Sequence, residues 1–410
     1  MANEFRVGVI GLGGRGMGHV HGILTERDDV IVTAVCDTYE DRMQNAISVC
    51  ASKRGWKVDA VSDYRALIER SDVDVVCIFS AWENHIPAAI HALDCGKQVC
   101  CEVGGAYSIE DCWDLIRAHE RSGIHCMLLE NCCYDRVEMM AMRMVREGLF
   151  GTIVHCEGGY QHDLREEVCF GRENRHYRLR NYQSRCCENY PTHELGPIAK
   201  ILDINRGNRM VSLSSVASGA FGLNDYASRK ENADPALRTF RFAQGDIVKT
   251  NIKCARGELI TLTLDTTLPR SYSRNFTVRG TKGLLSEPCD GIWLDDNHGA
   301  YGEWDHSFYG NIKNYRADWE HPVWRRFEEE GVKGGHGGMD WLVFDAYFES
   351  LKAGVVPPID TYDMAAWMAI TPLSEISIAN NGAPVEIPDF TRGMWTHRTE
   401  KNTGFYALDK

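Results

Sequence analysis

The sequence predicts an α/β protein with an N-terminal doubly wound parallel sheet and a C-terminal α/β domain built on a large open, mostly antiparallel sheet. The prediction comes from a regular alternation of short apolar runs and helical patterns in the N-terminal part, and from longer strand-like runs in the rest of the chain. A chain of 410 residues suggests two or three domains, since a domain averages roughly 150 residues. With 44% hydrophobic and 25% charged residues, the composition is that of a folded globular protein.

The N-terminal part contains five apolar runs rich in β-branched residues, each followed by a pattern of helical periodicity. We expect strands at 5–10, 30–36, 73–79, 98–102 and 125–130, and helices from the first glycine-rich turn to Glu26 and at 40–52, 63–70, 84–95 and 108–121. Strands that alternate with helices form a parallel sheet through right-handed crossovers.

The pattern changes after residue 131. We expect a helix at 136–148, strands at 152–160, 211–219, 246–255, 259–267 and 274–281, an irregular aromatic and glycine-rich loop at 286–340, and helices at 340–353 and 363–380. Short turns between the later strands indicate antiparallel pairing. We therefore expect one domain over residues 1–130 and a second over 131–410, with the C-terminal helices packing back on the first.

The charge balance argues against nucleic acid and membrane partners. The chain has 45 Lys and Arg against 58 Asp and Glu, a formal charge of −13, which disfavours binding to polyanions. No apolar run is long enough to span a membrane as a helix, and the N-terminus lacks the features of a signal peptide. We expect a cytoplasmic protein whose 16 cysteines are reduced core thiols.

The strongest local motif is the glycine-rich turn after the first strand, which reads Gly11-Leu-Gly13-Gly14-Arg-Gly16. It matches the G-x-G-x-x-G pattern of a Rossmann domain, in which the glycines permit a tight turn and close approach of a pyrophosphate to the helix N-terminus. Asp37 ends the second strand, where a carboxylate binds both ribose hydroxyls and repels a 2′-phosphate. The motif and its context predict NAD as the cofactor.

Tyr190 and His193 are candidates for proton transfer. They lie three residues apart, and Pro191 indicates a turn or a first helical turn, so both side chains can face one pocket. His336 lies among glycines, which favours a substrate-binding or loop-ordering role over core packing. No metal is expected, because His155 and Glu157 share a strand face without a third ligand at a suitable spacing.

The end of the fourth long strand reads Cys-Cys-Glu102-Val103-Gly-Gly. With the glycine-rich turn and the open sheet that follows, this layout resembles the Gfo/Idh/MocA oxidoreductases. Many members of that superfamily carry a lysine after the glutamate, which helps to deprotonate a sugar hydroxyl. Val103 cannot transfer a proton, so the resemblance implies a departure from the usual dehydrogenase chemistry.

Several further segments are similar to one branch of that superfamily, the NAD-dependent α-N-acetylgalactosaminidases of glycoside hydrolase family 109. They are SAWENH at 80–85, LENCCY at 129–134, GGY at 158–160, YPTH at 190–193, DINRG at 203–207, PRSYSR at 269–274 and GHGGMD at 335–340. The chain departs at Glu194, where many members have glycine.

The resemblance implies a role for each matched residue. Those expected to contact NAD, together with the turn glycines above, are Gly14, Arg15, Asp37, Trp82, Glu83, Asn84, His85, Glu102, Val103 and Asn131. Those expected to line the sugar site are Tyr160, Arg178, Tyr190, His193 and Tyr272, with His336 added from its own sequence context. We assign the proton-transfer roles to His193 and Tyr190, with Tyr160 and Tyr272 next; for the last two, packing on a sheet face is the alternative.

The activity implied is hydrolysis of an N-acetylgalactosaminide or related hexoside by transient oxidation at C3, elimination across C1 and C2, addition of water and re-reduction. One alternative is a conventional sugar dehydrogenase of the same superfamily, which releases NADH. A second is a noncatalytic sensor that binds sugar and NAD. A small carbohydrate is the expected partner, and an open sheet in this type of fold favours a homo-oligomer, a dimer or higher.

Overall fold

The computed structural model describes residues 4–295 and 306–409. The chain divides into two compact units, each built from segments that are distant in sequence. Unit 1 comprises residues 1–131, 330–366 and 400–410, and unit 2 comprises residues 132–329 and 367–399. The expected assignment of one part to the nucleotide and the other to the substrate stays a prediction.

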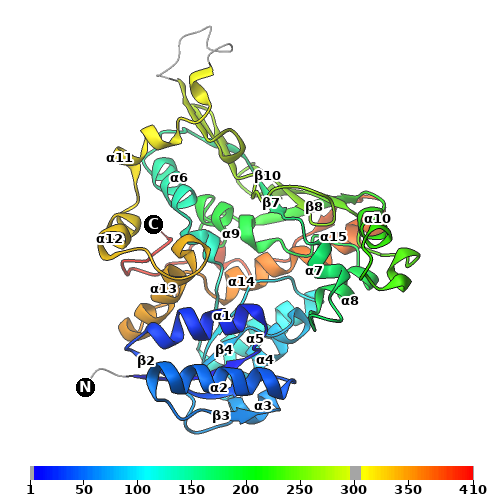
Figure 1. Ribbon diagram of the computed structural model, residues 1–410. Coiled ribbons are helices and arrows are strands. Elements are labelled where there is room, and N and C mark those ends of the chain that lie inside the picture. Colours follow the sequence, from blue (N-terminus) through cyan, green and yellow to red (C-terminus); the bar gives the residue numbers. More distant parts are fainter. Residues whose placement is uncertain (1–3, 296–305, 410) are drawn as a thin grey trace. The chain divides into compact units, whose positions relative to one another are not determined.

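Unit 1 contains a six-stranded parallel sheet in the order β3-β2-β1-β4-β5-β6. Successive strands are added toward one edge from β1 to β3 and toward the other edge from β4 to β6, so the strand order reverses between β1 and β4. Its strands are β1 Phe5–Ile10, β2 Val30–Cys36, β3 Asp59–Val61, β4 Val75–Ile78, β5 Gln98–Cys101 and β6 Cys126–Leu128. The helices between them are α1 Gly14–Gly22, α2 Glu40–Arg54, α3 Tyr64–Ile68, α4 Trp82–Asp94 and α5 Ile109–Ser122 (Figure 1). The predicted doubly wound parallel sheet is confirmed.

One strand of unit 1, β3, was not predicted from the sequence pattern. β3 has three residues, none of them buried, and pairs only with β2 at the edge of the sheet. A short exposed edge strand carries no apolar run, and short edges are one way in which proteins limit unwanted pairing.

The core of unit 1 is completed by α13, Met339–Ala353, which lies far along the sequence from the first strand. The Phe344 ring lies 5.0 Å from the ring of His19 on α1, and the Phe348 ring lies 5.6 Å from that of Phe5 on β1. Arg27 pairs with Asp345 of the same helix. Aromatic packing of this kind buries a large apolar area and so stabilises the attachment of the helix.

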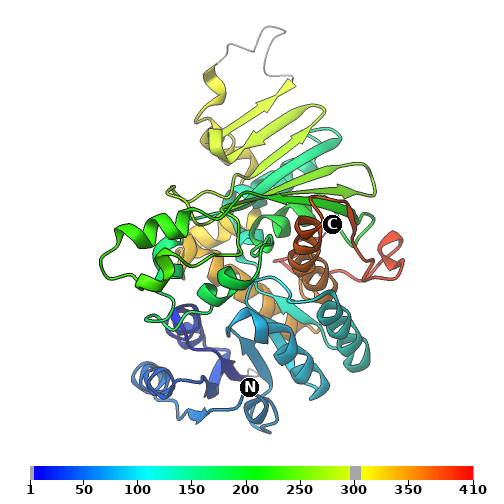
Figure 2. The same ribbon diagram turned by 90° about the vertical axis from the view of Figure 1, so that its right-hand side faces the viewer.

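Unit 2 contains an eight-stranded sheet in the order β13-β12-β11-β7-β10-β9-β8-β14, whose strands lie side by side in Figure 2. The strands are β7 Ile153–Gln161, β8 Met210–Ala217, β9 Ile247–Cys254, β10 Leu259–Asp265, β11 Thr277–Gly280, β12 Gly283–Ser286, β13 Gly291–Leu294 and β14 Val385–Glu386. All neighbours are antiparallel except β7 and β10, which run parallel. The sheet is therefore mostly antiparallel, as predicted.

Helices cover part of this sheet and of the surrounding loops. They are α6 Arg136–Arg146, α7 Arg165–Cys169, α8 Arg178–Ser184, α9 Thr192–Ile201, α10 Gly222–Arg229, α11 Arg316–Trp319, α12 Pro322–Glu330 and α15 Ile370–Ala379, while α14 Thr361–Met368 begins in unit 1 and ends in unit 2. α9 packs against β7, and α15 packs against β8. Every residue of α9 is buried, which explains why this helix has no amphipathic signature in the sequence.

The expectation of a purely irregular loop at 286–340 is wrong in the described part of that segment. β13, α11 and α12 all form there, and Trp324 on α12 donates a hydrogen bond to the carbonyl oxygen of Tyr134. Residues 296–305 of the expected loop lie outside the described residues. In the described residues, no helix combines the length and apolarity needed to cross a membrane.

Candidate active site

The glycine-rich turn lies between β1 and α1, where each glycine meets a different steric demand. Gly11 has a φ of +92°, and a Cβ there would lie 2.5 Å from the backbone nitrogen of Ser80. A Cβ on Gly16 would lie 2.0 Å from the carbonyl oxygen of Gly11. Gly14, at the start of α1, has open space where a Cβ would stand. Gly13 and Gly14 thus carry no side chain at the start of α1, where a pyrophosphate would approach.

The Asp37 carboxylate is held in place just after β2. It accepts hydrogen bonds from the backbone N–H of Leu12 at 2.7 Å and from that of Tyr39 at 3.0 Å. Arg42 Nη1 lies 3.7 Å from the same carboxylate. The two backbone donors orient the acid beside the glycine-rich turn, where a ribose would follow the pyrophosphate.

A second group of residues expected at the cofactor lies at the start of α4, whose first turn comprises Trp82, Glu83, Asn84 and His85. His85 is fully buried and contacts the Ser80 carbonyl oxygen through Nε2 at 2.9 Å, while burial lowers its pKa. Among the described residues, His85 Nδ1 and Ser80 Oγ are buried without a hydrogen-bond partner. Buried polar atoms are rarely left unpaired, so this strand end fits a polar ligand.

Glu102 lies at the end of β5 and gathers three donors. Its Oε1 accepts from Arg15 Nε at 2.7 Å and lies 2.7 Å from His19 Nε2, while its Oε2 accepts from the backbone N–H of Val103. Although burial opposes ionisation, Arg15 and His19 hold the Glu102 pKa at about 2. Burial also lowers the pKa of His19, so a neutral imidazole donates to an ionised carboxylate.

The segment before α13 joins this network. Asp340 accepts two hydrogen bonds from the Arg15 guanidinium, at 2.6 and 2.8 Å, and one from Asn131 Nδ2 at 2.7 Å. His336 Nδ1 lies 2.9 Å from Arg15 Nη1 and 2.8 Å from Asp340 Oδ2. His336 and Arg15 hold the Asp340 pKa far below its usual value.

Each residue expected at the cofactor thus lies in unit 1, on the strand ends and helix starts where open α/β sheets bind ligands. His336, expected at the sugar, lies in unit 1 beside Arg15, and its role stays a prediction. Val103 is buried and aliphatic, so it offers no group for proton transfer.

Four of the residues expected at the sugar, Tyr160, Tyr190, His193 and Tyr272, lie in unit 2. Together with His162 we call them the tyrosine–histidine cluster. The Tyr160 and Tyr190 ring centroids are 4.3 Å apart, and the Tyr190 and His193 rings meet at 90° with centroids 4.8 Å apart. Tyr272 lies edge-on to Tyr160 at 6.4 Å and is half exposed. Three phenols and two imidazoles are therefore linked by ring contacts, which suits proton transfer to and from a polyol.

His162 is the member of the cluster that the sequence did not predict at the sugar site. Its Nδ1 lies 3.0 Å from the Tyr160 hydroxyl, and its ring lies 5.3 Å from that of Tyr272. Burial and the nearby Arg178 lower the His162 pKa, and the ring shares a hydrogen bond with the Tyr160 hydroxyl through Nδ1. The signal was available, because residues two apart on a strand share a face.

Arg178, at the start of α8, borders the cluster. Its guanidinium carbon lies 5.2 Å from the Tyr190 ring centroid and 5.8 Å from that of Tyr160, and its Nε lies 3.2 Å from Glu167 Oε1. A buried cation over two phenol rings orients them and favours electron-rich partners such as sugar oxygens.

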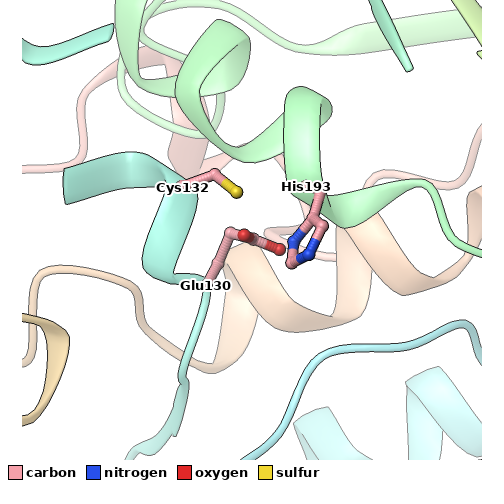
Figure 3. Close-up of side chains that lie close together, drawn as sticks. All are labelled: Glu130, Cys132 and His193. Atoms are coloured by element: carbon pink, nitrogen blue, oxygen red, sulfur yellow. The ribbon is translucent and has the colours of Figure 1, made fainter. Parts of the chain in front are cut away.

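Cys132 of unit 2 approaches the catalytic candidate His193 (Figure 3). Its Sγ and a ring nitrogen of His193 lie within 4.8 Å of each other. Figure 3 also labels Glu130, which belongs to unit 1. A structural zinc site needs four ligands, and Cys132 and His193 supply two. The expectation that the protein binds no metal stays a prediction.

Two family models together match most of the chain. The model described as the glycosyl hydrolase 109 C-terminal domain matches residues 134–397, and the model of the oxidoreductase family with an NAD-binding Rossmann fold matches residues 5–129. The first match covers more than half of the chain. The chain belongs to glycosyl hydrolase family 109. The predicted resemblance is confirmed, and the family 109 chain is an enzyme of the glycosidase class.

Named relatives agree with this membership. A glycosyl hydrolase family 109 protein of Stenotrophomonas maltophilia is 39% identical, with 96% of this chain and 91% of that protein covered. A protein of Tannerella forsythia named alpha-N-acetylgalactosaminidase is 37% identical, with 96% and 87% covered.

Solved structures of dehydrogenases share the fold. Apo scyllo-inositol dehydrogenase from Lactobacillus casei matches with a TM-score of 0.65 at 15% identity, covering 94% of this chain and 99% of that one. Myo-inositol 2-dehydrogenase from Lactobacillus plantarum matches with a TM-score of 0.64 at 16% identity, covering 94% and 100%. At this identity the likeness concerns the architecture alone.

Proposed function

We propose that this family 109 chain is an NAD-dependent glycosidase that cleaves an α-N-acetylgalactosaminide or a related hexoside. The observation that carries the proposal is the tyrosine–histidine cluster, in a chain whose N-terminal part has the glycine turn and the acid of a dinucleotide site. The alpha-N-acetylgalactosaminidase among the relatives supports the choice of sugar.

The proposed cofactor site consists of the turn glycines, Asp37, the first turn of α4, and the Glu102–Arg15 pair. Bound NAD would supply a hydride acceptor and donor at C3 of the sugar. Asp37 would bind the ribose hydroxyls, and the bare N-terminus of α1 would bind the pyrophosphate.

The residues of the cluster would then move protons on the sugar. Once C3 is a ketone, the proton on C2 is acidic, and we assign its removal to His193, with Tyr190 at its ring edge holding the substrate. Loss of the C2 proton breaks the bond between C1 and the glycosidic oxygen, which takes up a proton and leaves as an alcohol. Water then adds across C1 and C2, so that C1 gains a hydroxyl and C2 regains a proton, and return of the hydride would reduce C3. No pair of carboxylates flanking the glycosidic bond is required, unlike in most glycosidases.

The test is hydrolysis of 4-nitrophenyl α-N-acetylgalactosaminide by the purified protein in D₂O. We expect release of nitrophenol without net formation of NADH, and deuterium at C2 of the sugar product. Stoichiometric NADH would instead support a conventional dehydrogenase, and binding of sugar and NAD without turnover would support a sensor. If the catalytic base exchanges its proton with D₂O, a product that carries only protium at C2 would exclude the elimination route.

A further inference from the structure

The hydroxyl of Tyr160 is hydrogen-bonded to the ring of His162 in unit 2. The phenol oxygen lies 3.0 Å from Nδ1 of that ring. Tyr160 is only 7% exposed, whereas His162 is partly exposed. The Tyr160 ring also lies 5.4 Å from that of His193, so the phenol belongs to the candidate site and not only to the sheet. The pair therefore connects a buried hydroxyl of the site with an imidazole that solvent reaches.

The backbone on either side of β7 holds the two rings in place. The backbone N–H of His162 donates a hydrogen bond to the carbonyl oxygen of Asp265 on β10 at 2.9 Å. Gln161, the residue between Tyr160 and His162, accepts one from the backbone N–H of Ser273 at 3.0 Å. The sheet thus fixes the distance between the phenol and the imidazole, which favours a precise role over a loose contact.

Several charged and titratable groups lie near His162. They are Asp163 beside it, Arg165 and Glu167 on α7, Arg178 on α8, His193 on α9, Asp265 at the end of β10 and Tyr272 in the loop that follows β10. Burial and Arg178 lower the His162 pKa, while Glu167 and Asp163 oppose that change. The ring is therefore neutral at pH 7 and able to take up a proton.

The proposed reaction contains a proton that still lacks an acceptor. Oxidation at C3 removes a hydride from the carbon and a proton from its hydroxyl, and His193 is assigned the proton on C2. An imidazole nitrogen is a stronger base than a phenol oxygen, so we expect the Tyr160 hydroxyl to donate to Nδ1. A phenol that donates to a base can accept a proton on its oxygen while it passes its own proton on.

We propose that Tyr160 and His162 act as one proton-accepting pair for the C3 hydroxyl of the sugar. As the hydride leaves C3 for bound NAD, the hydroxyl proton moves to the Tyr160 oxygen and the phenol proton moves to His162 Nδ1. C3 becomes a ketone, and His162 becomes an imidazolium. The same transfers run in reverse when C3 is reduced, so the pair ends each cycle as it began. Tyr160 touches the substrate, and His162 acts through it. The choice of C3 rests on the proposed function.

The activity test compares variants of the holoenzyme on 4-nitrophenyl α-N-acetylgalactosaminide. An asparagine at position 162 can keep a hydrogen bond to the phenol, but its amide cannot take up the proton. We expect Tyr160→Phe and His162→Asn each to lower kcat/KM by about 10²-fold or more. The double variant should be no slower than Tyr160→Phe, because His162 acts through the phenol. A wild-type rate in His162→Asn, or losses that multiply in the double variant, would overturn the proposal.

His155→Asn is the matched control for this test. It places the same substitution on the same strand, where His155 Nε2 contacts Thr261 Oγ1 at 3.0 Å instead of a member of the cluster. We expect this variant to keep the wild-type kcat/KM.

Isotope effects identify the step that the pair serves. With deuterium at C3 of the glycoside, we expect a larger isotope effect on kcat/KM in His162→Asn than in the wild-type protein, because loss of the hydride then limits the rate more strongly. Deuterium at C2 should give no larger effect in the variant than in the wild-type protein. Any other pattern would overturn the assignment to the C3 hydroxyl.

A titration without substrate separates this inference from the proposed function. Nuclear magnetic resonance of histidine-labelled protein gives the pKa of His162, whose signal is identified by its absence in His162→Asn. Tyr160→Phe removes a hydrogen bond that only the neutral ring accepts, so we expect the His162 pKa to rise in that variant. An unchanged or lower pKa would overturn the proposal whether or not the wild-type protein cleaves glycosides. A raised pKa in a protein without hydrolytic activity would count against the proposed function only.

Discussion

Tyr190 and His193, the residues proposed to transfer protons, lie three positions apart in the sequence and contact each other with their rings at 90°. Pro191 precedes α9 and provides the N-cap position, so that His193 falls in the first helical turn. Both side chains are buried to more than nine-tenths, which removes water from the groups that would exchange protons with the substrate.

At this position we expect His193→Ala and Tyr190→Phe each to lower kcat by about 10²–10⁴-fold, the range for losing a positioned acid or base. Bound nucleotide and the far-ultraviolet circular dichroism spectrum should be unchanged, since both residues belong to unit 2. Steady-state kinetics on the nitrophenyl glycoside provide the measurement. A wild-type rate in His193→Ala would transfer the base role to Tyr160.

Val103 provides a second prediction for a single residue. The resemblance to the superfamily implies that a lysine stands at this position in many dehydrogenases, and the Val103 side chain is buried. We expect Val103→Lys to leave glycoside cleavage unimproved and to weaken nucleotide binding, because a buried ammonium without a partner is costly. Val103→Leu serves as the size control. A large gain in cleavage by the lysine variant would contradict the site assignment.

Among the elements, the turn before α13 has a role that only the folded chain reveals. Residues 334, 336, 337 and 338 all have positive φ, including the non-glycine His336 at 51°. This strained turn brings Asp340 and His336 onto Arg15 at the glycine-rich turn. Strained backbone persists where the surrounding contacts hold it, and here those contacts are the Arg15 hydrogen bonds.

We expect Asp340→Asn to release bound NAD about 10-fold faster than the wild-type protein, because a hydrogen bond to a charged partner is worth about 1.5–3 kcal/mol. Nucleotide release is measured by the loss of protein-bound NADH fluorescence after dilution into excess NAD. Asp345→Asn on the same helix, which pairs with Arg27 elsewhere in unit 1, is the control and should show the wild-type release rate.

The Glu102 network gives a pH dependence. The folded-state pKa of Glu102 is about 2, below its ordinary value of 4.5, so ionised Glu102 stabilises the fold above that ordinary value, and the contribution is lost as the pH falls toward 2. We expect the Tm of the protein to fall as the pH is lowered from 4.5 to about 2. Glu102→Gln should show a lower Tm at pH 7 and a shallower acid decline in calorimetry. An equally steep decline in that variant would mean that other acids dominate.

For the whole molecule, the residues assigned to the two parts of the proposed reaction lie in different units. Every residue assigned to the cofactor belongs to unit 1, and the tyrosine–histidine cluster belongs to unit 2. In the proposed reaction the hydride is returned within each cycle, so no step requires the nucleotide to leave. In that reaction the cofactor would stay bound to the enzyme from one turnover to the next.

We therefore expect the purified protein to carry NAD or NADH after extensive dialysis, and no NADP, because the Asp37 carboxylate would repel a 2′-phosphate. Acid extraction followed by chromatography of the nucleotides identifies the cofactor. Recovery of NADP, or a protein that neither carries nor binds NAD, would contradict both the assignment of Asp37 and the proposed reaction.

Features that depend on neighbouring residues were predictable from the sequence. The parallel sheet follows from apolar runs that alternate with helical periodicity, and the order of glycines with Asp37 at the next strand end indicates the dinucleotide site. The pairing of Tyr190 with His193 follows from their spacing around Pro191. In each case the participating residues lie on one or two successive elements, so local spacing determines their geometry.

Contacts between distant segments were decided by the tertiary structure. Asp340 and His336 reach Arg15 from the opposite end of the sequence, Glu194 reaches Arg274 across several intervening strands, and no periodicity links such positions. The parallel pairing of β7 with β10 likewise depends on which strands the intervening chain leaves adjacent. The sequence by itself determined the class of fold and the types of residue at the site. Packing between remote segments decided which buried charges meet. Burial removes water from a charged side chain, so an unpaired charge destabilises the fold only once the core has formed around it.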